Sequence, residues 1–323
     1  MPFPQLSACA AAPGVIRLVG HRGARGVLPE NTIEGFEFAL TSGLKLLELD
    51  VTATRDGVVV ITHNHRLTRS MVRDATGHWL QGEEPKVSQL TYAELSEFDA
   101  GGLDGTTAYG QRFPDQSFMT GVAIPRLTDL LDLLRQREHQ DVHLFLEIKS
   151  DPDLVQNSTA RTALVEAVVA EVRAAHLEPR TILHSFDWTM LEDCQRIAPD
   201  MPTSFLTQLP ENDDDIGEDS SKAVNPVEGC SAMDLPDRVA AAGGQLWCPY
   251  HLDVTEQSLA RARELGLTTM VWTVNESDDI QRMITLGVDA ICTDYPGRAQ
   301  RLLLQQGLHW LPEAARSCVT TCA

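Results

Sequence analysis

Three acidic side chains in strand-like segments have the chemistry to bind a hard divalent cation together. Glu48 and Asp50 lie two positions apart in the run KLLELDV, so on a strand both side chains point to the same side. Glu147 lies near the end of another such run, HLFLEIK. Neighbouring carboxylates repel one another unless a cation or a proton compensates. With no soft ligand nearby, three carboxylates suit Mg²⁺ or Ca²⁺, although Glu-x-Asp alone also fits ordinary ion pairs at a strand end.

Two histidines are candidates for proton transfer. His21 follows the apolar run VIRLV, and His63 ends the run GVVVITH, which is expected to form a hairpin after the second strand. Imidazole suits this work because its ordinary pKa lies near neutrality. One ring could activate a hydroxyl group and the other protonate a leaving oxygen. A lone histidine is more often a packed side chain, but two beside acidic residues at strand ends favour catalysis.

The charge of the chain limits the partners it can have. The formal net charge is −20, which disfavours nucleic acid and anionic membrane surfaces because both would be repelled. An anionic small molecule would need local positive charge. Arg22, with its planar fork, and Lys149, as a point charge, are the residues expected to contact phosphate oxygens. Together with a metal ion they would make a cationic pocket in an acidic protein.

Short apolar runs alternate with amphipathic helical patterns along most of the chain, and this alternation predicts the elements that position these residues. Asn31 followed by Glu34 resembles a capping box at the start of the first helix. Gly20 and Gly23 are expected to let the backbone bend closely around a phosphate. Strands are expected at 15–20, 45–51, 143–149, 180–185, 202–207, 245–248, 268–274 and 288–293, and helices near 31–42, 158–175, 188–197, 233–242, 255–265, 276–286 and 296–306.

Eight strands alternating with helices predict a (β/α)₈ TIM barrel, formed by residues 1–323 as one domain; a doubly wound open sheet is the alternative. In such a barrel the side chains at the carboxyl ends of the strands converge on one site. The polar stretch 70–125 is expected as an insertion between the second and third strands that passes over this end. The acidic, turn-rich stretch 210–229 is expected to be a mobile loop.

The chain shows no apolar run near 18 residues, so no stable membrane insertion is expected. The N-terminus lacks the basic region of a signal peptide, so none is expected. The seven cysteines are scattered and form no Cys-x-x-Cys pair, which suggests neither a zinc site nor a disulfide framework. A reducing cytoplasm is therefore the expected location.

The chain resembles the glycerophosphodiester phosphodiesterase family in four blocks that occur in the family's order: HRGARGVLPENT, ELDVTATRDGVVVITHNHRL, LEIK and VWTVN. The resemblance covers about 15–300. It implies a barrel enzyme that cleaves a deacylated phospholipid, a small-molecule glycerophosphodiester, to glycerol 3-phosphate and an alcohol. By matching position it implies these roles: metal ligands Glu48, Asp50 and Glu147; acid and base His21 and His63; phosphate contacts Arg22 and Lys149; and Trp272 lining the pocket for the glycerol or alcohol part.

The chain departs from the family pattern at one position, where Asn64 follows His63 in place of the usual aspartate. If that aspartate orients or charges the imidazole, Asn64 would weaken the acid–base pair; if it only caps a turn, Asn64 serves equally well. Two other functions stay open: a lysophospholipase D-type phosphodiesterase, and a catalytically weak barrel that binds phosphodiesters. Attack by the adjacent glycerol hydroxyl through a cyclic phosphate and direct attack by water are both compatible with these residues.

Overall fold

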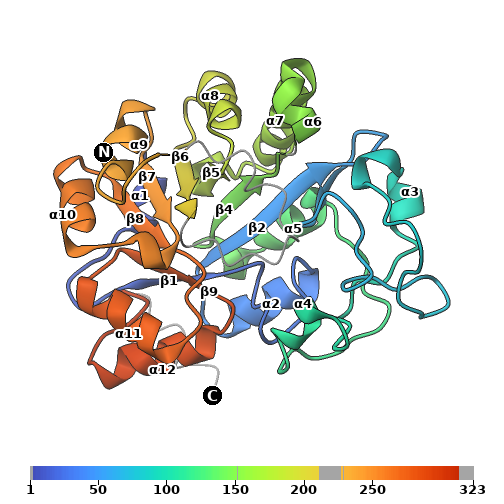
Figure 1. Ribbon diagram of the computed structural model, residues 1–323, viewed down its shortest axis with the longest axis horizontal. Helices are drawn as coiled ribbons and strands as arrows, with labels where there is room; N and C mark the ends of the chain where they lie inside the picture. The colour runs from blue at the N-terminus through green and yellow to red at the C-terminus, as the bar shows by residue number, and fades with distance from the viewer. Residues whose placement is uncertain (1–2, 151, 211–226, 228, 313–323) are drawn as a thin grey trace.

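Eight parallel strands close into a barrel in the computed structural model, which describes residues 3–150, 152–210, 227 and 229–312 (Figure 1). The barrel closes because β1 pairs with both β2 and β9. The (β/α)₈ prediction is therefore confirmed, and the open-sheet alternative is wrong. The barrel strands are β1 (Arg17–Gly20), β2 (Leu46–Ala53), β4 (His143–Ile148), β5 (Thr181–Ser185), β6 (Thr203–Thr207), β7 (Leu246–Pro249), β8 (Thr268–Val271) and β9 (Ala290–Thr293).

Alternation along the strands separates two apolar layers. On β2, Leu47 and Leu49 pack in the large cluster between the strands and the surrounding helices, whereas Leu46 packs in the cluster inside the barrel. Glu48 and Asp50 share the inward side with Leu46 because they lie two and four positions further along. The barrel interior is thus apolar at the amino end of the strand and acidic toward its carboxyl end.

Helices surround the barrel and follow the strands in the expected order (Figure 1). A short N-terminal helix, α1, contributes Leu6 and Cys9 to the interior cluster. The helices around the barrel are α2 (Ile33–Thr41), α5 (Leu127–Leu134), α7 (Ser158–Ala174), α8 (Trp188–Ile197), α9 (Leu235–Ala241), α10 (Glu256–Glu264), α11 (Ser277–Leu286) and α12 (Pro296–Gln305). Short helices are α1 (Gln5–Cys9), α3 (Tyr92–Leu95), α4 (Ala108–Gln111) and α6 (Pro152–Gln156), and single 3-10 turns are η1 (Val87–Gln89), η2 (Arg137–His139), η3 (Glu178–Arg180) and η6 (His251–Asp253).

The predicted capping box at Asn31 is wrong. Helix α2 begins after Thr32, whose hydroxyl accepts a hydrogen bond from the backbone N–H of Gly35 at 3.1 Å. Asn31 instead has a left-handed backbone, with φ of 55°, and its side-chain amide donates to Asp50 Oδ2 at 2.9 Å. Asn31 therefore contacts an acidic residue of β2 and does not cap the helix.

The expected insertion, 70–125, belongs to a lobe at one side of the barrel (right in Figure 1). The lobe also includes β3 (Val59–Ile61), which precedes the predicted stretch and pairs antiparallel with β2 outside the barrel. The lobe has its own small apolar cluster, in which Val60, Leu67 and Ile124 are buried. Its helix α4 places Tyr109 in the wall of the pocket at the carboxyl ends of the strands. The expectation that this stretch reaches over the site is confirmed for α4.

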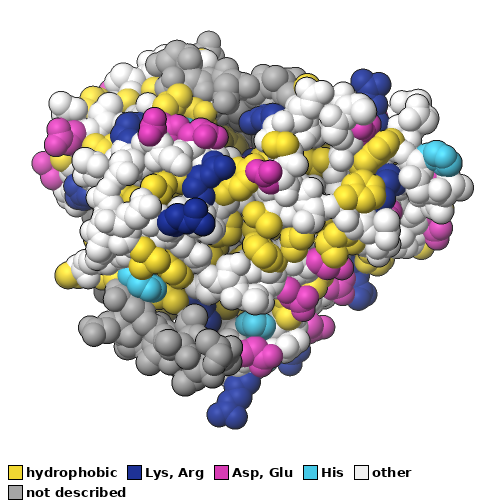
Figure 2. All heavy atoms as spheres, turned by 90° about the horizontal axis from the view of Figure 1, so that it is seen from below, with side chains coloured by type: hydrophobic (Ala, Val, Ile, Leu, Met, Phe, Trp, Pro, Cys, Tyr) yellow, Lys and Arg dark blue, Asp and Glu magenta, His cyan; other side chains and the backbone are white. Residues whose placement is uncertain are grey.

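Two further expectations concern the surface. No helix among the described residues is both long and apolar enough to cross a membrane. The acidic stretch 210–229 lies almost entirely outside the described residues. On the face drawn in Figure 2, acidic side chains lie in several separate groups between hydrophobic and basic ones, so the negative charge is not gathered there into one patch.

Candidate active site

A pocket of about 340 Å³ lies at the carboxyl ends of the strands and contains most of the predicted residues. Asp50 and Lys149 are buried in contact with them, because the Lys149 ammonium lies 2.9 Å from Glu147 Oε1 and 3.4 Å from Asp50 Oδ1. The sequence-based set is therefore brought together at one place. The predicted residues in the pocket wall are His21, Arg22, Glu48, His63, Glu147 and Trp272.

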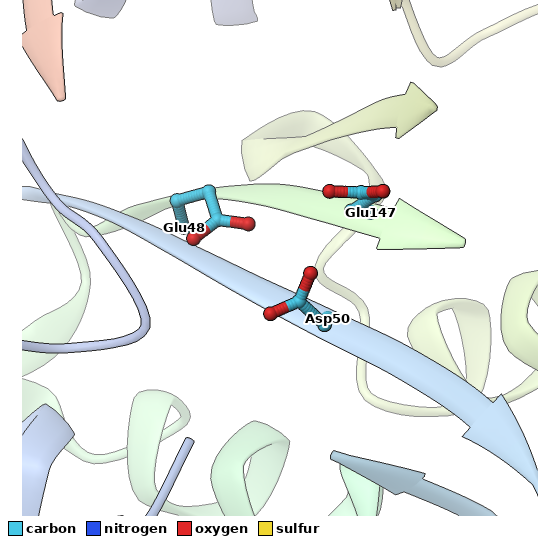
Figure 3. A group of neighbouring side chains, drawn as sticks. All are labelled: Glu48, Asp50 and Glu147. Carbon is cyan, nitrogen blue, oxygen red and sulfur yellow. The ribbon is translucent and has the colours of Figure 1, made fainter. Parts of the chain in front are cut away.

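The three carboxylates lie on the inner side of two neighbouring strands, Glu48 and Asp50 on β2 and Glu147 on β4 (Figure 3). One oxygen from each lies within 4.8 Å of the others, and all three residues are buried. Burial raises the pKa of Glu48 well above its ordinary value, and repulsion from the other two carboxylates adds to the effect. Although burial acts the same way on Asp50, its attraction to His63 and Lys149 holds its pKa below the ordinary value.

Both predicted phosphate contacts are ion-paired with acidic residues. Arg22 Nη1 lies 2.8 Å from Glu30 Oε1, and its Nε lies 3.3 Å from Asp50 Oδ2. The backbone N–H of Arg22 donates to Glu48 Oε2 at 3.0 Å, in a left-handed conformation with φ of 49°. The backbone N–H of Arg22 thus holds the Glu48 carboxylate, while the guanidinium of Arg22 pairs with the carboxylates of Glu30 and Asp50.

His21 has a buried carboxylate partner that the sequence analysis did not include. Its Nδ1 lies 2.7 Å from Asp294 Oδ1, and because a carboxylate only accepts, Nδ1 carries the proton. Arg25 donates to both oxygens of Asp294, at 2.9 and 3.0 Å, and Asn275 donates to Oδ2 at 2.6 Å. Burial and the charge of Arg25 lower the pKa of His21 to about 4. The lowered pKa favours the neutral imidazole, with Nδ1 as the donor, and its Nε2 lies 3.8 Å from Glu48 Oε2.

His63 has an uncharged partner. Its Nδ1 lies 2.7 Å from Asn64 Oδ1, and the Asn64 amide nitrogen donates to Met71 Sδ at 3.2 Å. The second contact places the amide oxygen toward the imidazole. Asn64 thus supplies the acceptor that orients His63, but without the negative charge of an aspartate.

Tyr109, which sequence reasoning also missed, connects the insertion to the site through Glu30 and Arg25. The Tyr109 hydroxyl donates to Glu30 Oε2 at 2.5 Å and accepts from Arg25 Nη1 at 3.1 Å. Asp294 could have been found, because it directly follows the strand-like run AICT at the same end of the barrel as the others. Tyr109 gives no such signal, since it lies far from any strand end.

Gly20 and Gly23 are required by the loop itself. A Cβ on Gly20 would lie 2.2 Å from the carbonyl oxygen of Gly23. Gly23 has φ of 87°, and a Cβ there would lie 2.8 Å from the carbonyl carbon of Gly35. The backbone therefore folds tightly on itself at this point, which fixes His21 and Arg22 between the two glycines.

Comparison with known proteins places these features in a family. The model of the glycerophosphoryl diester phosphodiesterase family matches residues 21–298. A glycerophosphodiester phosphodiesterase of Caldanaerobacter subterraneus is 25% identical over 290 residues, covering 90% of this chain and 98% of that protein. A crystal structure described as a putative glycerophosphoryl diester phosphodiesterase of Silicibacter pomeroyi is 53% identical and superposes with a TM-score of 0.87, covering 96% of this chain and 100% of the other.

A more distant structure shares the fold. An Oleispira antarctica phosphodiesterase, solved in complex with the product sn-glycerol-3-phosphate, is 19% identical with a TM-score of 0.64, covering 90% of this chain and 97% of that one. The family resemblance of the four sequence blocks is confirmed by the family match, which spans nearly all of the described barrel. The chain belongs to the glycerophosphoryl diester phosphodiesterase family and is a phosphoric diester hydrolase.

Proposed function

We propose that the protein hydrolyses glycerophosphodiesters to glycerol 3-phosphate and an alcohol, with a divalent ion held by Glu48, Asp50 and Glu147. The observation that carries the proposal is the convergence of these carboxylates with His21 and His63 at one pocket. We propose further that this one-domain enzyme acts in a reducing cytoplasm, because its seven cysteines are scattered and include no Cys-x-x-Cys pair.

The acidic residues fit a hard cation. Their oxygens are close enough to share one ion. The pKa of Glu48 is raised first by burial and then by repulsion from the other two carboxylates, and a cation would relieve that repulsion. Asp50 Oδ1 is buried and accepts no hydrogen bond, although the Lys149 ammonium lies 3.4 Å away, so a bound ion would share this oxygen with Lys149. A bound Mg²⁺ or Ca²⁺ supplies positive charge at a phosphate oxygen and a neighbouring hydroxyl group.

The side chains of this protein divide the remaining work. His21, neutral and with Nδ1 donating to Asp294, accepts the proton of the attacking hydroxyl or water at Nε2. His63, oriented by Asn64, protonates the leaving alcohol oxygen. Arg22 and Lys149 exchange part of their contact with the carboxylates for contact with the phosphate.

A metal-dependent assay tests this function. The protein is stripped with EDTA and then given Mg²⁺ or Ca²⁺ with glycerophosphocholine, and glycerol 3-phosphate is measured. We expect turnover only with added ion, and a decrease of ~10²–10⁴-fold in kcat for His21→Ala and His63→Ala. Near-normal turnover in either variant removes that residue from the mechanism.

A second measurement tests the metal site without activity. Ion binding to the folded protein raises its melting temperature. We expect this increase in the original protein and its loss in Glu147→Gln, while Glu138→Gln, on the exposed turn η2, retains it. Equal responses in all three proteins would contradict the assignment of Glu147 as a ligand.

A further inference from the structure

One wall of the pocket is formed by aromatic side chains that the proposed chemistry does not use. Trp272 follows β8, with its ring 5.3 Å from that of Tyr250 and 5.3 Å from that of Phe186 (centroid to centroid). The indole is fixed because its N–H donates to the backbone oxygen of Cys248 at 2.9 Å. All three aromatic residues line the pocket. Together they form a rigid aromatic wall, the name used below for Phe186, Tyr250 and Trp272.

Two members of the aromatic wall, Tyr250 and Trp272, lie across the barrel from the carboxylates, whereas Phe186 follows β5, the strand next to β4. Around the closed barrel the strands follow the order β1-β9-β8-β7-β6-β5-β4-β2, so β7 is four strands from β2 and β8 is four strands from β4. Tyr250 follows β7 and Trp272 follows β8, whereas the carboxylates lie on β2 and β4. A diester with its glycerol end at the carboxylates would therefore extend its alcohol group toward the aromatic wall.

Acidic side chains stand at the rim on the same side. Glu276 and Asp279, at the start of α11, both line the pocket and are partly or largely exposed. Both are in long ion pairs, with Arg298 Nη1 3.8 Å from Glu276 Oε1 and His251 Nδ1 3.8 Å from Asp279 Oδ1, so a cationic ligand would share these carboxylates with them. The faces of aromatic rings attract a cation, and nearby carboxylates add to this attraction. A quaternary ammonium group suits such a site best because it is weakly hydrated and its surface consists of methyl groups.

We propose that the aromatic wall, with Glu276 and Asp279, recognises a cationic alcohol group, so that the preferred substrates are glycerophosphodiesters with a quaternary ammonium head group of the choline type. This inference rests on the proposed hydrolytic function. It makes Tyr250, Phe186, Glu276 and Asp279 specificity residues, and it assigns Trp272 to the alcohol end of the substrate.

A charge-free isostere tests the inference directly. The enzyme, with a saturating divalent ion, is given glycerophosphocholine and, separately, the 3,3-dimethylbutyl ester of glycerol 3-phosphate, in which carbon replaces the ammonium nitrogen. The two head groups have the same shape and differ in charge. We expect kcat/KM to be about 10-fold or more higher for glycerophosphocholine, because contact with several rings and carboxylates favours the cation.

Variants then locate the source of the preference. The double variant Glu276→Gln/Asp279→Asn and the single variant Trp272→Leu are each expected to reduce the preference severalfold. Trp272→Phe, which keeps an aromatic face, is expected to retain more of it than Trp272→Leu. The matched control is Asp278→Asn, an exposed carboxylate in the same helical turn that does not line the pocket, and its preference is expected to be unchanged. Melting temperatures confirm that each variant is folded.

The outcomes separate this inference from the proposed function. Equal kcat/KM for the two esters overturns the inference, as does an unchanged preference in the folded double variant and Trp272→Leu. Higher kcat/KM for a lysophospholipid than for glycerophosphocholine also overturns it, because the aromatic wall would then be an apolar groove for an acyl chain. By contrast, no hydrolysis of either ester with any divalent ion contradicts the proposed function itself.

Discussion

His21 and Asp294 lie 273 positions apart in the chain, yet Nδ1 of the histidine is 2.7 Å from a carboxylate oxygen of the aspartate. They meet because β1 and β9 are neighbouring strands, and the backbone N–H of His21 donates to Thr293 at 3.1 Å, directly before Asp294. Asp294 is fully buried and also accepts from Arg25. It is therefore a positioning residue for His21, held rigidly from several sides.

Replacing Asp294 by Asn should lower kcat by about 10²-fold with a much smaller change in KM. The amide nitrogen replaces one of the two oxygens that accept from His21, Arg25 and Asn275, and a donor facing the ring would reverse the tautomer of His21. The uncompensated Arg25 should also destabilise the fold, by about 3–5 kcal/mol. Steady-state kinetics at low temperature and thermal unfolding measure the two effects. Asp289→Asn is the matched control, since Asp289 also caps backbone donors beside β9 but lies at the other end of the strand; it should cost stability and leave kcat unchanged.

Asn64 should be important as an acceptor and not as a charge. Asn64→Ala removes the oxygen that orients His63, and we expect kcat to decrease by about 10-fold. Asn64→Asp retains an oxygen at that place and should keep kcat within a few-fold of the original. Equal kcat in the alanine variant and the original protein would show that the contact between Asn64 and His63 does not orient the catalytic acid.

Tyr109, which belongs to the insertion, should stabilise the site. Tyr109→Phe removes the hydroxyl that links Glu30 and Arg25, and leaving those buried groups without it should cost about 1–3 kcal/mol of unfolding free energy. Tyr92→Phe is the control, because the Tyr92 hydroxyl is half-buried and makes one long contact, 3.5 Å, to a backbone oxygen. Denaturant unfolding should show a change below about 0.5 kcal/mol there; a comparable loss in both variants would contradict the assignment.

Glu171 on α7 should make stability depend on pH. Burial raises its pKa to about 7 from an ordinary 4.5, although Arg126 opposes the shift, and its Oε2 is buried without a hydrogen bond. A raised pKa favours the folded state while the group is protonated, so this contribution is complete below pH 4.5 and is lost as pH rises through about 7. Glu171→Gln keeps a neutral group at every pH.

Melting temperatures at pH 5 and pH 8.5 check this sign. We expect Glu171→Gln to become more stable relative to the original protein as pH rises. Glu166→Gln, exposed on the same helix, should differ from the original protein by the same amount at both pH values. If the melting temperature of Glu171→Gln relative to that of the original protein decreased as pH rises, the assigned effect of burial on the Glu171 pKa would be contradicted.

The sequence predicted the parts of the molecule that repeat a local pattern. Each barrel strand was expected within a few residues of its observed bounds, because apolar runs and helical periodicity are local properties. Helix α5 was missed although Leu127, Leu130, Leu131 and Leu134 follow helical spacing and are buried. Asn31 was misassigned because its short polar side chain suits a helix cap as well as the contact with Asp50 that it makes.

The site was predicted where strand ends could be read in order, and missed where a contact joins distant segments. His21 and Glu147 stand at the ends of recognisable strands, and Glu48 lies within another. Tyr109 and Arg25 meet only after the insertion has packed beside the barrel, and no spacing in the chain records that packing. Arg22 forms ion pairs with Glu30 and Asp50, and these pairs likewise depend on three-dimensional proximity and not on residue type.

The pairing of β1 with β9 has a consequence for the order in which parts of the protein fold. The acidic groups of β2 and β4 come from the first half of the chain, whereas Asp294 belongs to a strand near its end. Contacts between distant segments form late, since a long loop must close first. Enzymatic activity should therefore appear only when the ring of strands is complete, later in refolding than helical signal, which would make turnover a reporter of the last step of assembly.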